Sequence, residues 1–228
     1  MHAKLISHSQ PSFRIHAGEL AQTGLDNIQD LVAYCARVSN PSNQANTKTT
    51  PKLLDYLIKH KHWSPFEMAS ACIEIETTRD IARQLLRHRS FSFQEFSQRY
   101  ADIRDLNNDF IIREARLQDP KNRQNSIVNE DSALEDEWAN KQLAIIEMVK
   151  MTYDWAIENG IAKEQARAIL PEGNTISRLY ANGTIRSWIH YIELRSANGT
   201  QKEHMNLALA VAEAIGKIYP SVVNFIKE

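Results

Sequence analysis

A cluster of arginine, histidine and hydroxyl side chains in the first half of the chain has the composition of an anion-binding site. Arg87, His88 and Arg89 are consecutive, and residues 90–99 add three serines, one glutamate and a further arginine. Guanidinium groups carry a permanent charge and donate paired hydrogen bonds to phosphate, while serine hydroxyls can reach its remaining oxygens. Glu95 is unsuited to phosphate but can accept from a ribose hydroxyl, a base N–H or a flavin. These residue types favour a nucleotide ligand, although charge alone favours a solvated basic helix end followed by a polar loop.

Two regular elements are expected to position this cluster. Residues 78–86 carry apolar side chains at the spacing of one buried helical stripe, which puts Arg83 and Arg87 on one face. The preceding residues, 68–77, alternate apolar and polar side chains as a half-buried strand does. A strand that leads directly into a helix would hold the basic cluster at the C-terminal end of that helix.

The other patterns predict an α+β fold, with mixed helices around a small, mainly antiparallel sheet in a single domain spanning 1–228. The polar stretch 118–132 is poorly patterned and is expected to be a surface excursion. Asn182-Gly183 is a typical turn, and residues 200–203 match a capping box. A long helix after the excursion should pack through a stripe of Leu134, Trp138, Ile145, Val149, Tyr153 and Ile157. We further expect helices at 25–38, 51–60, 163–170, 184–195 and 200–215, and strands at 4–7, 110–112 and 175–180.

Composition places the chain among ordinary globular proteins. Its 228 residues are 43% hydrophobic and 24% charged, enough for a core without disulfides or a structural metal. The formal net charge of −1 argues against a dedicated nucleic-acid-binding protein. No apolar run approaches membrane length and no targeting segment is recognisable, so we expect a cytoplasmic protein whose partners are neither membranes nor nucleic-acid polymers.

The two cysteines are not expected to do chemistry. Cys35 and Cys72 both lie in apolar segments, which is typical of a reduced protein. A nucleophilic thiolate needs an electropositive, partly exposed site. We therefore interpret Cys35 as a buried structural thiol.

The spacing within the basic cluster matches a known signature. Arg-His-Arg at 87–89, Ser92, Ser97 and Arg99 occupy all six positions of the motif of the flavin-dependent thymidylate synthases. Further segments resemble the same family in the same order along the chain, at 35–39, 62–67, 166–171 and 186–195. The chain therefore resembles this family over most of its length. A motif of this length is far more specific than a single glycine-rich motif.

The resemblance implies a reaction, its cofactors and an assembly. The reaction is the reductive methylation of dUMP to dTMP without a cysteine nucleophile. Methylenetetrahydrofolate provides the carbon and leaves as tetrahydrofolate, while FAD reduced by NADPH carries the hydride. The chain lacks a glycine-rich dinucleotide motif, and the family is known to hold FAD in a different way, between subunits. The resemblance thus implies a homotetramer with sites shared between subunits.

Residue by residue, the resemblance implies two overlapping sets of site residues. Those expected to bind FAD are Ser64, Arg87, His88, Arg89, Glu95, Thr184, Arg186 and His190. Those expected to bind dUMP are Gln84, Arg87, Glu95, Ser97, Arg99, Arg167 and Arg195. Arginines of the second set would hold the phosphate, and Arg195 would be the catalytic group at the uracil edge. Taken singly, Arg167 and Arg186 are slightly better explained as helix-face charges, and His190 as a core histidine. No metal ligand is expected.

Two other classes of function remain open from the sequence. A nucleotide-binding regulator would use the same basic motif without turnover. A metal-dependent hydrolase would use His60, His62, Glu67 and His88, although the spacing of these residues matches no familiar zinc motif. Flavin absorbance of the purified protein would distinguish the flavoenzyme from the hydrolase.

Overall fold

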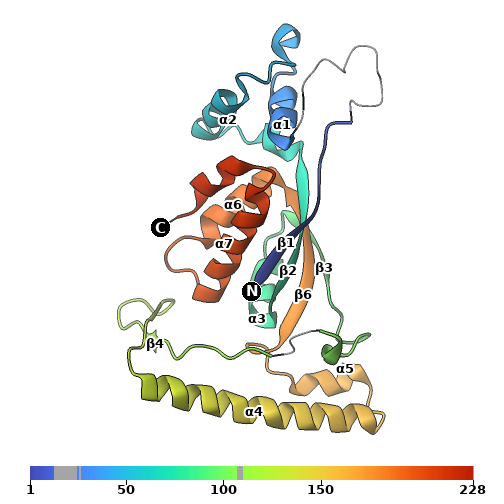
Figure 1. Ribbon diagram of the computed structural model, residues 1–228, viewed down its shortest axis with the longest axis vertical. Coiled ribbons are helices and arrows are strands. Elements are labelled where there is room, and N and C mark those ends of the chain that lie inside the picture. Colours follow the sequence, from blue (N-terminus) through green and yellow to red (C-terminus); the bar gives the residue numbers. More distant parts are fainter. Residues whose placement is uncertain (13–24, 26, 107–109, 228) are drawn as a thin grey trace.

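The computed structural model describes residues 1–12, 25, 27–106 and 110–227. At its centre, four antiparallel strands form one sheet (Figure 1). In spatial order across the sheet these are β1 (His2–His8), β2 (Ser70–Thr78), β6 (Ile176–Thr184) and β3 (Phe91–Glu95). Helices lie against one face of the sheet and beyond its two ends (Figure 1), and the predicted α+β class is confirmed. Within the described ranges no helix is both long and apolar enough to cross a lipid bilayer.

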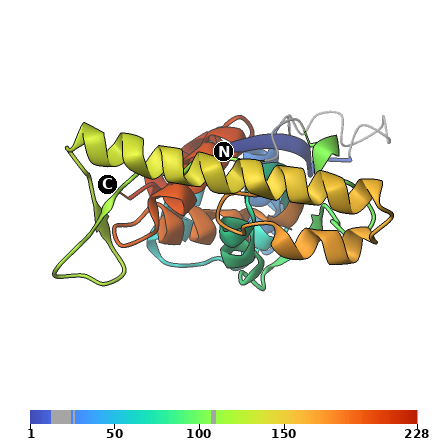
Figure 2. The same cartoon turned by 90° about the horizontal axis from the view of Figure 1, so that it is seen from below.

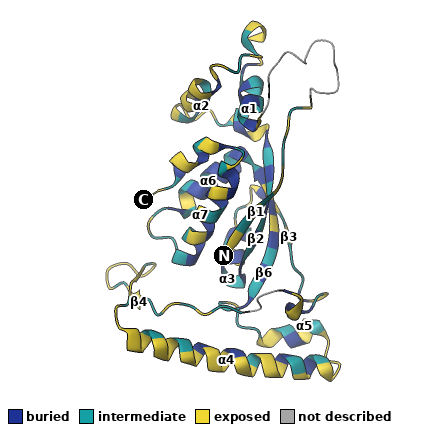
Figure 3. Cartoon of the chain, viewed as in Figure 1, coloured by how far each residue is buried: buried dark blue, intermediate teal, exposed yellow. Residues whose placement is uncertain are grey.

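Two C-terminal helices and the sheet enclose the main hydrophobic core. α6 (Ile185–Arg195) and α7 (Lys202–Gly216) cover one face of the sheet, and their inward sides are buried (Figure 3). In β2 the buried and half-buried residues alternate as predicted, so that Ile73 and Ile75 are fully buried in this core. Trp188 is also fully buried, and its indole N–H donates to a carbonyl oxygen of β2 over 3.0 Å. The core therefore satisfies the one polar atom of its largest side chain.

A further helical layer lies below the sheet in the view of Figure 1. α4 (Ser132–Glu158) runs across this end of the molecule, as Figure 2 shows from below. α5 (Lys163–Ala166) lies beside it. A small separate core is formed here by Ile103, Tyr153, Ala156 and Ala166. This layer adjoins the far end of β6, where the chain leaves α5 and enters the sheet.

The remaining elements are short. The other helices and strands are α1 (Ile28–Ala36), α2 (Thr50–Lys59), α3 (Arg79–Leu86), β4 (Leu117–Gln118) and β5 (Ser126–Ile127). Short 3-10 helices lie at Pro41–Asn43, Ser64–Glu67, Ile103–Asp105, Arg167–Ile169 and Pro220–Phe225. α1 and α2 lie at the opposite end of the sheet from α4, and α3 follows β2 without a loop (Figure 1).

Most of the predicted helices and strands are confirmed within a few residues. α1 begins three residues later than the predicted start at Leu25, because the Asn27 side chain caps it by accepting from the amide of Asp30 over 3.0 Å. The predicted helix at 163–170 is a short α-helix that tightens into a 3-10 turn before Pro171. Cys35 is half-buried rather than buried.

The turn predicted at Asn182-Gly183 is wrong. β6 continues through both residues, and Gly183 pairs with residues of β2 and β3 on its two sides. A Cβ on Gly183 would lie 2.4 Å from the ring of Phe91. This glycine therefore allows an aromatic ring to pack closely on the strand, which is a recognised use of glycine inside a sheet.

The capping box predicted at 200–203 is also wrong. No side chain caps α7, whose N-cap residue is Gln201. The hydroxyl of Thr200 donates instead to the carbonyl oxygen of Leu194 over 3.4 Å. Glu203 turns away to accept from Arg116, which comes from the segment before β4. A long-range ion pair has replaced the local cap.

The strand predicted at 110–112 is reduced to a single bridge between Phe110 and Thr175. Side chains take over the backbone hydrogen bonds that a neighbouring strand would have made. The Asn174 amide donates to the carbonyl oxygen of Ile111 over 2.9 Å, and the amide of Arg113 donates to Oε1 of Gln142 over 2.9 Å. The backbone amide of Ile111 also donates to the carbonyl oxygen of Asn174 over 2.9 Å, so the segment is held both by the residues just before β6 and by α4.

The apolar stripe predicted for α4 is only partly buried. Tyr153 is buried, whereas Leu134, Trp138 and Ile145 are exposed. The excursion at 118–132 also has more structure than expected. β4 and β5 form a two-stranded hairpin, and Asp131 caps the start of α4.

Candidate active site

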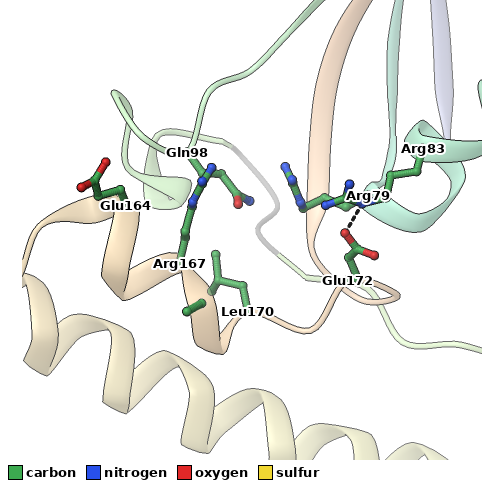
Figure 4. Close-up of a pocket in the computed structure, with 8 residues that line it drawn as sticks. Arg79, Arg83, Gln98, Glu164, Arg167, Leu170 and Glu172 are labelled. Carbon is green, nitrogen blue, oxygen red and sulfur yellow. Dashed lines mark hydrogen bonds and ion pairs between the residues drawn. The ribbon is translucent and has the colours of Figure 1, made fainter. Parts of the chain in front are cut away.

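α3 directs its polar side chains into two different regions of the fold. Its apolar side is buried in the main core, as the helical spacing predicted. Arg79 and Arg83, four residues apart, reach toward the segment between α5 and β6 (Figure 4). Gln84 instead contacts α7, and His88, two residues beyond the end of the helix, contacts α6. A single helix thus connects two clusters of charged and polar residues.

The first cluster surrounds His88, and we call it the His88 group. Nε of Arg195 donates to Nε2 of His88 over 3.0 Å. The His88 ring packs edge-on against Tyr191, with 5.1 Å between the ring centroids. On α7, His204 lies 5.7 Å from the ring of Tyr191, and its Nδ1 is 3.2 Å from Oε1 of Gln84. The group therefore contains Gln84, His88, Tyr191, Arg195 and His204, drawn from α3, α6, α7 and the residues just after α3.

Burial and neighbouring cations keep the histidines of this group neutral. Burial lowers the pKa of His88 to about 4, with Arg195 and Arg87 acting in the same direction. Burial, Arg195 and His88 lower the pKa of His204 to about 3. Burial also lowers the pKa of Arg195, but an arginine stays charged at any physiological pH. The group therefore presents a half-buried guanidinium beside neutral rings, which suits it to bind negative charge.

The second cluster, the arginine pocket, lines a cavity of about 530 Å³. Figure 4 shows Arg79 and Arg83 on one side of it, with Gln98 and Arg167 opposite. Arg83 forms an ion pair with Glu172. The charged residues of the lining are Arg79, Arg83, Glu164, Arg167 and Glu172. Three cations against two anions give this hollow an excess of positive charge, so it favours an anionic ligand.

Glu95 of the sequence motif is attached to this pocket. It lies at the end of β3, which the sequence did not predict to be a strand. Nη1 of Arg79 is 3.6 Å from Oε1 of Glu95, and the hydroxyl of Ser177 donates to the same oxygen over 2.8 Å. The carboxylate is thus held by β6 and α3 together.

The segment after β3 provides the rest of the motif. The carbonyl oxygen of Ser97 accepts from the amides of Tyr100 and Ala101 over 3.0 Å each, which turns the chain. Nε of Arg99 lies 3.5 Å from the Glu164 carboxylate. Gln98 is buried, and its amide nitrogen has no hydrogen-bond partner among the described residues. An unsatisfied buried donor costs about 1–3 kcal/mol, so a ligand that accepts from it would gain affinity.

The residues predicted at the start of α6 form a third region. The Thr184 hydroxyl caps α6 by accepting from the backbone N–H three residues later over 3.2 Å. Arg186 forms an ion pair with Glu67, in the 3-10 helix that begins at Ser64. Local capping and one ion pair account for these side chains within a single chain.

His190 belongs to the same region. Its ring packs edge-on against Trp63, with 4.6 Å between the ring centroids. Burial lowers its pKa, Arg186 acts in the same direction, and Glu193 opposes them. His190 is thus a half-buried, aromatic-packed histidine.

Comparison with known proteins agrees with the sequence motif. Residues 20–221 match the model of the family Thy1, described as thymidylate synthase complementing protein. Over 225 residues the chain is 49% identical to a probable flavin-dependent thymidylate synthase of Paramecium bursaria Chlorella virus 1, with 97% of each chain covered. The chain belongs to the flavin-dependent thymidylate synthase family. The resemblance drawn from residues 87–99 is therefore confirmed.

Other members of the flavin-dependent thymidylate synthase family and a solved structure support the assignment. The family's protein from a Synechocystis species is 47% identical over 223 residues, again with 97% of each chain covered. The crystal structure of a UMP/dUMP methylase, PolB from Streptomyces cacaoi bound with 5-Br dUMP, has a TM-score of 0.77. It is 26% identical, and the match covers 98% of this chain and 93% of that one.

For this flavin-dependent thymidylate synthase family member, the structure brings some predicted site residues together and separates others. Gln84, His88 and Arg195 meet in the His88 group, and Arg167 lies in the arginine pocket. Thr184, Arg186 and His190 lie in or next to α6, and Ser64 begins the 3-10 helix whose Glu67 pairs with Arg186.

Several residues that were not predicted to be site residues lie in these clusters. Arg79, Arg83 and Gln98 line the arginine pocket, and His204 completes the His88 group. The sequence placed Arg83 and Arg87 on one face of the predicted helix, and the spacing of Arg79 and Arg83 by one turn could have extended that cationic face to Arg79. No local signal marks His204, because it is buried by residues distant in the sequence, among them Gln84 of α3 and Tyr191 of α6.

The histidine-metal alternative gains no support from the geometry. His60 and His62 lie beside the ring of Tyr56, with His60–His62 centroids 6.1 Å apart. Glu67 is paired with Arg186, and His88 accepts from Arg195. Among the residues that the structure describes, no three histidine, cysteine or acidic side chains converge on a point where a metal could bind.

Proposed function

We propose that this protein is an FAD-dependent thymidylate synthase that converts dUMP to dTMP. In this reaction the methylene carbon of methylenetetrahydrofolate is joined to C5 of uracil, the C5 proton leaves, and a hydride completes the methyl group. Tetrahydrofolate is released, and NADPH restores the reduced flavin. The observation that carries the proposal is the concentration of arginines around the motif in a chain whose formal net charge is only −1.

The arginine pocket is proposed to take the nucleotide phosphate. Arg167 lines it, and Arg99 reaches it through Glu164, in keeping with the expectation that both bind dUMP. Ser97, also expected to bind dUMP, starts the turn that carries Gln98 into the pocket. Paired guanidinium donors bind phosphate in a fixed orientation, which would direct the nucleoside out of the arginine pocket.

The residues after α3 fit an anionic flavin nucleotide. Arg87 and Arg89 are exposed, and no carboxylate in the described part of the chain pairs with either guanidinium. Two unpaired arginines separated only by His88 suit a pyrophosphate or an electron-rich ring. We propose that they hold FAD together with Ser64, His88, Glu95, Thr184, Arg186 and His190. When bound, the flavin would supply the hydride chemistry.

Arg195 is proposed to be the catalytic residue. Its guanidinium is half-buried, and its Nε is occupied by His88. The remaining N–H donors are held in a fixed plane, where they can stabilise negative charge developing on the uracil ring. Gln84, also in the dUMP set, lies in the same group and would bind the nucleotide beside it.

A cysteine nucleophile is not part of the proposal. Burial raises the pKa of both Cys35 and Cys72, which keeps the thiols protonated at neutral pH. Both are free thiols, and this supports a reducing, cytoplasmic setting.

We further propose that the enzyme is a homotetramer with shared sites. The outer side of α4 carries an unusual number of exposed apolar side chains, including Met151 at 67% and Trp155 at 58% exposed. Ile145 and Met148 extend the same surface. A patch of this kind favours contact with another protein surface, here a second copy of the chain. Sedimentation of the purified protein should give the mass of four chains, and a monomer would contradict this part of the proposal.

One experiment tests the catalytic proposal against a nucleotide-binding regulator. The purified protein should show flavin absorbance, oxidise NADPH, and release tritium from dUMP labelled at C5 only when methylenetetrahydrofolate is present. A regulator would bind dUMP without releasing tritium. A colourless protein that binds no added FAD would contradict the proposal.

A further inference from the structure

A series of hydrogen-bonded side chains leads from a buried ion pair to the His88 group. Glu203 of α7 is buried and accepts from Arg116, while Nη1 of Arg113 lies 3.3 Å from its second oxygen. That second oxygen also accepts from the amide nitrogen of Gln201 over 2.9 Å. Burial raises the pKa of this carboxyl, but the hydrogen bond from Arg116 and others lower it to about 2. Glu203 is therefore an ionised group that can only accept hydrogen bonds.

Because Glu203 only accepts, it determines which group donates in each of the next hydrogen bonds of the series. Because Gln201 must turn its NH₂ group to Glu203, its oxygen Oε1 faces Gln84. Gln84 must in turn present its own NH₂ group, and its Nε2 lies 2.9 Å from that oxygen. The oxygen of the Gln84 amide then faces Nδ1 of His204 at 3.2 Å. An amide oxygen only accepts, so the proton of His204 must be on Nδ1.

His204 is well placed to hold this arrangement because its ring is shielded from water. It is fully buried, at 0% exposed, between α3 and α6. Its Nε2 is buried and has no hydrogen-bond partner in the described part of the chain. The ring therefore makes one hydrogen bond, and that bond goes to Gln84.

We propose that His204 is a positioning residue that, as the last member of a relay from Glu203 through Gln201, holds the Gln84 amide in one orientation for dUMP. The part concerning dUMP rests on the proposed function. With one N–H given to Gln201 and one lone pair given to His204, the amide keeps one N–H and one lone pair for a ligand. An amide free to flip could exchange these two groups, whereas the relay prevents it.

The tautomer of His204 tests the relay without any measurement of activity. The full-length protein, labelled with ¹⁵N-histidine, is examined by NMR at neutral pH, and His204 is assigned from the signals missing in His204→Asn. We expect a neutral ring with its proton on Nδ1, the form that free imidazole side chains populate less in water. A proton on Nε2, or a charged ring, would overturn the relay.

Two variants test whether Glu203 sets the direction of these hydrogen bonds. In Glu203→Gln the new amide can donate as well as accept, so the preference for Nδ1–H should be lost. Tyr191→Phe removes the neighbouring hydroxyl but leaves the relay intact, and it should keep the wild-type tautomer. A folded Glu203→Gln protein with an unchanged His204 signal would overturn the role of Glu203. If that variant does not fold, the wild-type tautomer alone decides.

Nucleotide binding tests the positioning role. His204→Leu removes the donor, and His204→Asn retains an N–H near the position of Nδ1. Loss of one neutral hydrogen bond should weaken dUMP binding by about threefold to tenfold in His204→Leu, with affinity restored in His204→Asn. Equal affinity in the two variants would overturn the positioning role. A wild-type protein that binds no dUMP would instead contradict the proposed function, and the tautomer measurement would still test the relay.

Discussion

Arg195 donates from Nε to Nε2 of His88 over 3.0 Å, which joins two residues 107 positions apart in the sequence. Because arginine can only donate, Nε2 of His88 must carry a lone pair and its proton must be on Nδ1. The resemblance assigned His88 to the flavin and Arg195 to the nucleotide. Their hydrogen bond indicates that the two proposed sites adjoin within one chain.

We predict that Arg195→Ala lowers the rate of dTMP formation by about a hundredfold to a thousandfold, the usual cost of removing a donor that stabilises developing charge. Flavin content and fold should be retained, because Arg195 is proposed to bind dUMP rather than FAD and is only half-buried. Glu193→Gln on the same helix is the matched control, since Glu193 pairs with Lys227 at 3.0 Å. Near-normal dTMP formation by Arg195→Ala with full flavin would remove Arg195 from catalysis.

Replacing Arg87 or Arg89 by lysine should weaken FAD binding. Lysine keeps the charge but loses the planar pair of donors. Fluorescence titration of FAD into Arg89→Lys measures the effect, with Arg123→Lys in the exposed hairpin between β4 and β5 as the control. If Arg89→Lys binds FAD as tightly as the control does, Arg89 does not contact the flavin.

Arg167→Ala should weaken binding of dUMP while leaving binding of deoxyuridine unchanged, because the arginine pocket is proposed to hold only the phosphate. A charge-assisted hydrogen bond contributes about 1.5–3 kcal/mol, so the loss should be about tenfold to a hundredfold. Calorimetric titration with both ligands measures it. An equal effect on the nucleoside and the nucleotide would place Arg167 elsewhere in the site.

The free energy of unfolding should fall as the pH is lowered from about 7 to about 5, because the unfolded chain then takes up protons that the folded chain excludes. The pKa of His88 is about 4 and that of His204 about 3 in the folded protein, both below the ordinary 6.5. The stability that these neutral histidines contribute is thus fully present above the pKa of an unfolded histidine, and it is lost as the pH falls below that value. Each such histidine contributes at most about 1.4 kcal/mol per pH unit. Urea unfolding at several pH values measures the slope, which should be shallower in His204→Leu; an equal slope would show that His204 is protonated in the folded state.

The excursion at 118–132 should be dispensable for folding, provided that the cap of α4 is kept. Removing residues 120–124 from the hairpin tip should leave cooperative thermal unfolding intact, since these side chains are exposed. Asp131→Ala should cost about 1 kcal/mol, because its carboxylate accepts from the amides of Ala133 and Leu134. Loss of cooperative unfolding in the shortened chain, followed by circular dichroism, would mean that the hairpin packs against the rest of the fold.

Local patterns in the sequence were sufficient to predict the helices and strands in which buried residues recur at a regular spacing. β2 and α3 were predicted because their apolar residues recur with the periods of a strand and a helix, and the motif at 87–99 identified the family. β3 was missed because it is a short edge strand of five residues, and its alternation of Phe91 and Phe93 with polar residues was read only as part of the ligand-binding motif. Gly183 was wrongly predicted to form a turn because the sequence does not distinguish a glycine that forms a turn from one that makes room for an aromatic ring, here that of Phe91.

The sequence alone determined the family, the periodic elements and the identity of most candidate ligands, since these depend on residue type and short-range spacing. Tertiary structure decided which of those residues meet. Arg79, Arg83 and Gln98 form a pocket with Arg167 only because the segment before β6 returns to α3. His204 faces Gln84 from 120 positions away, and its pKa and tautomer follow from burial and from Glu203. Contacts of this kind depend on how distant segments pack, and no local pattern in the chain records that packing.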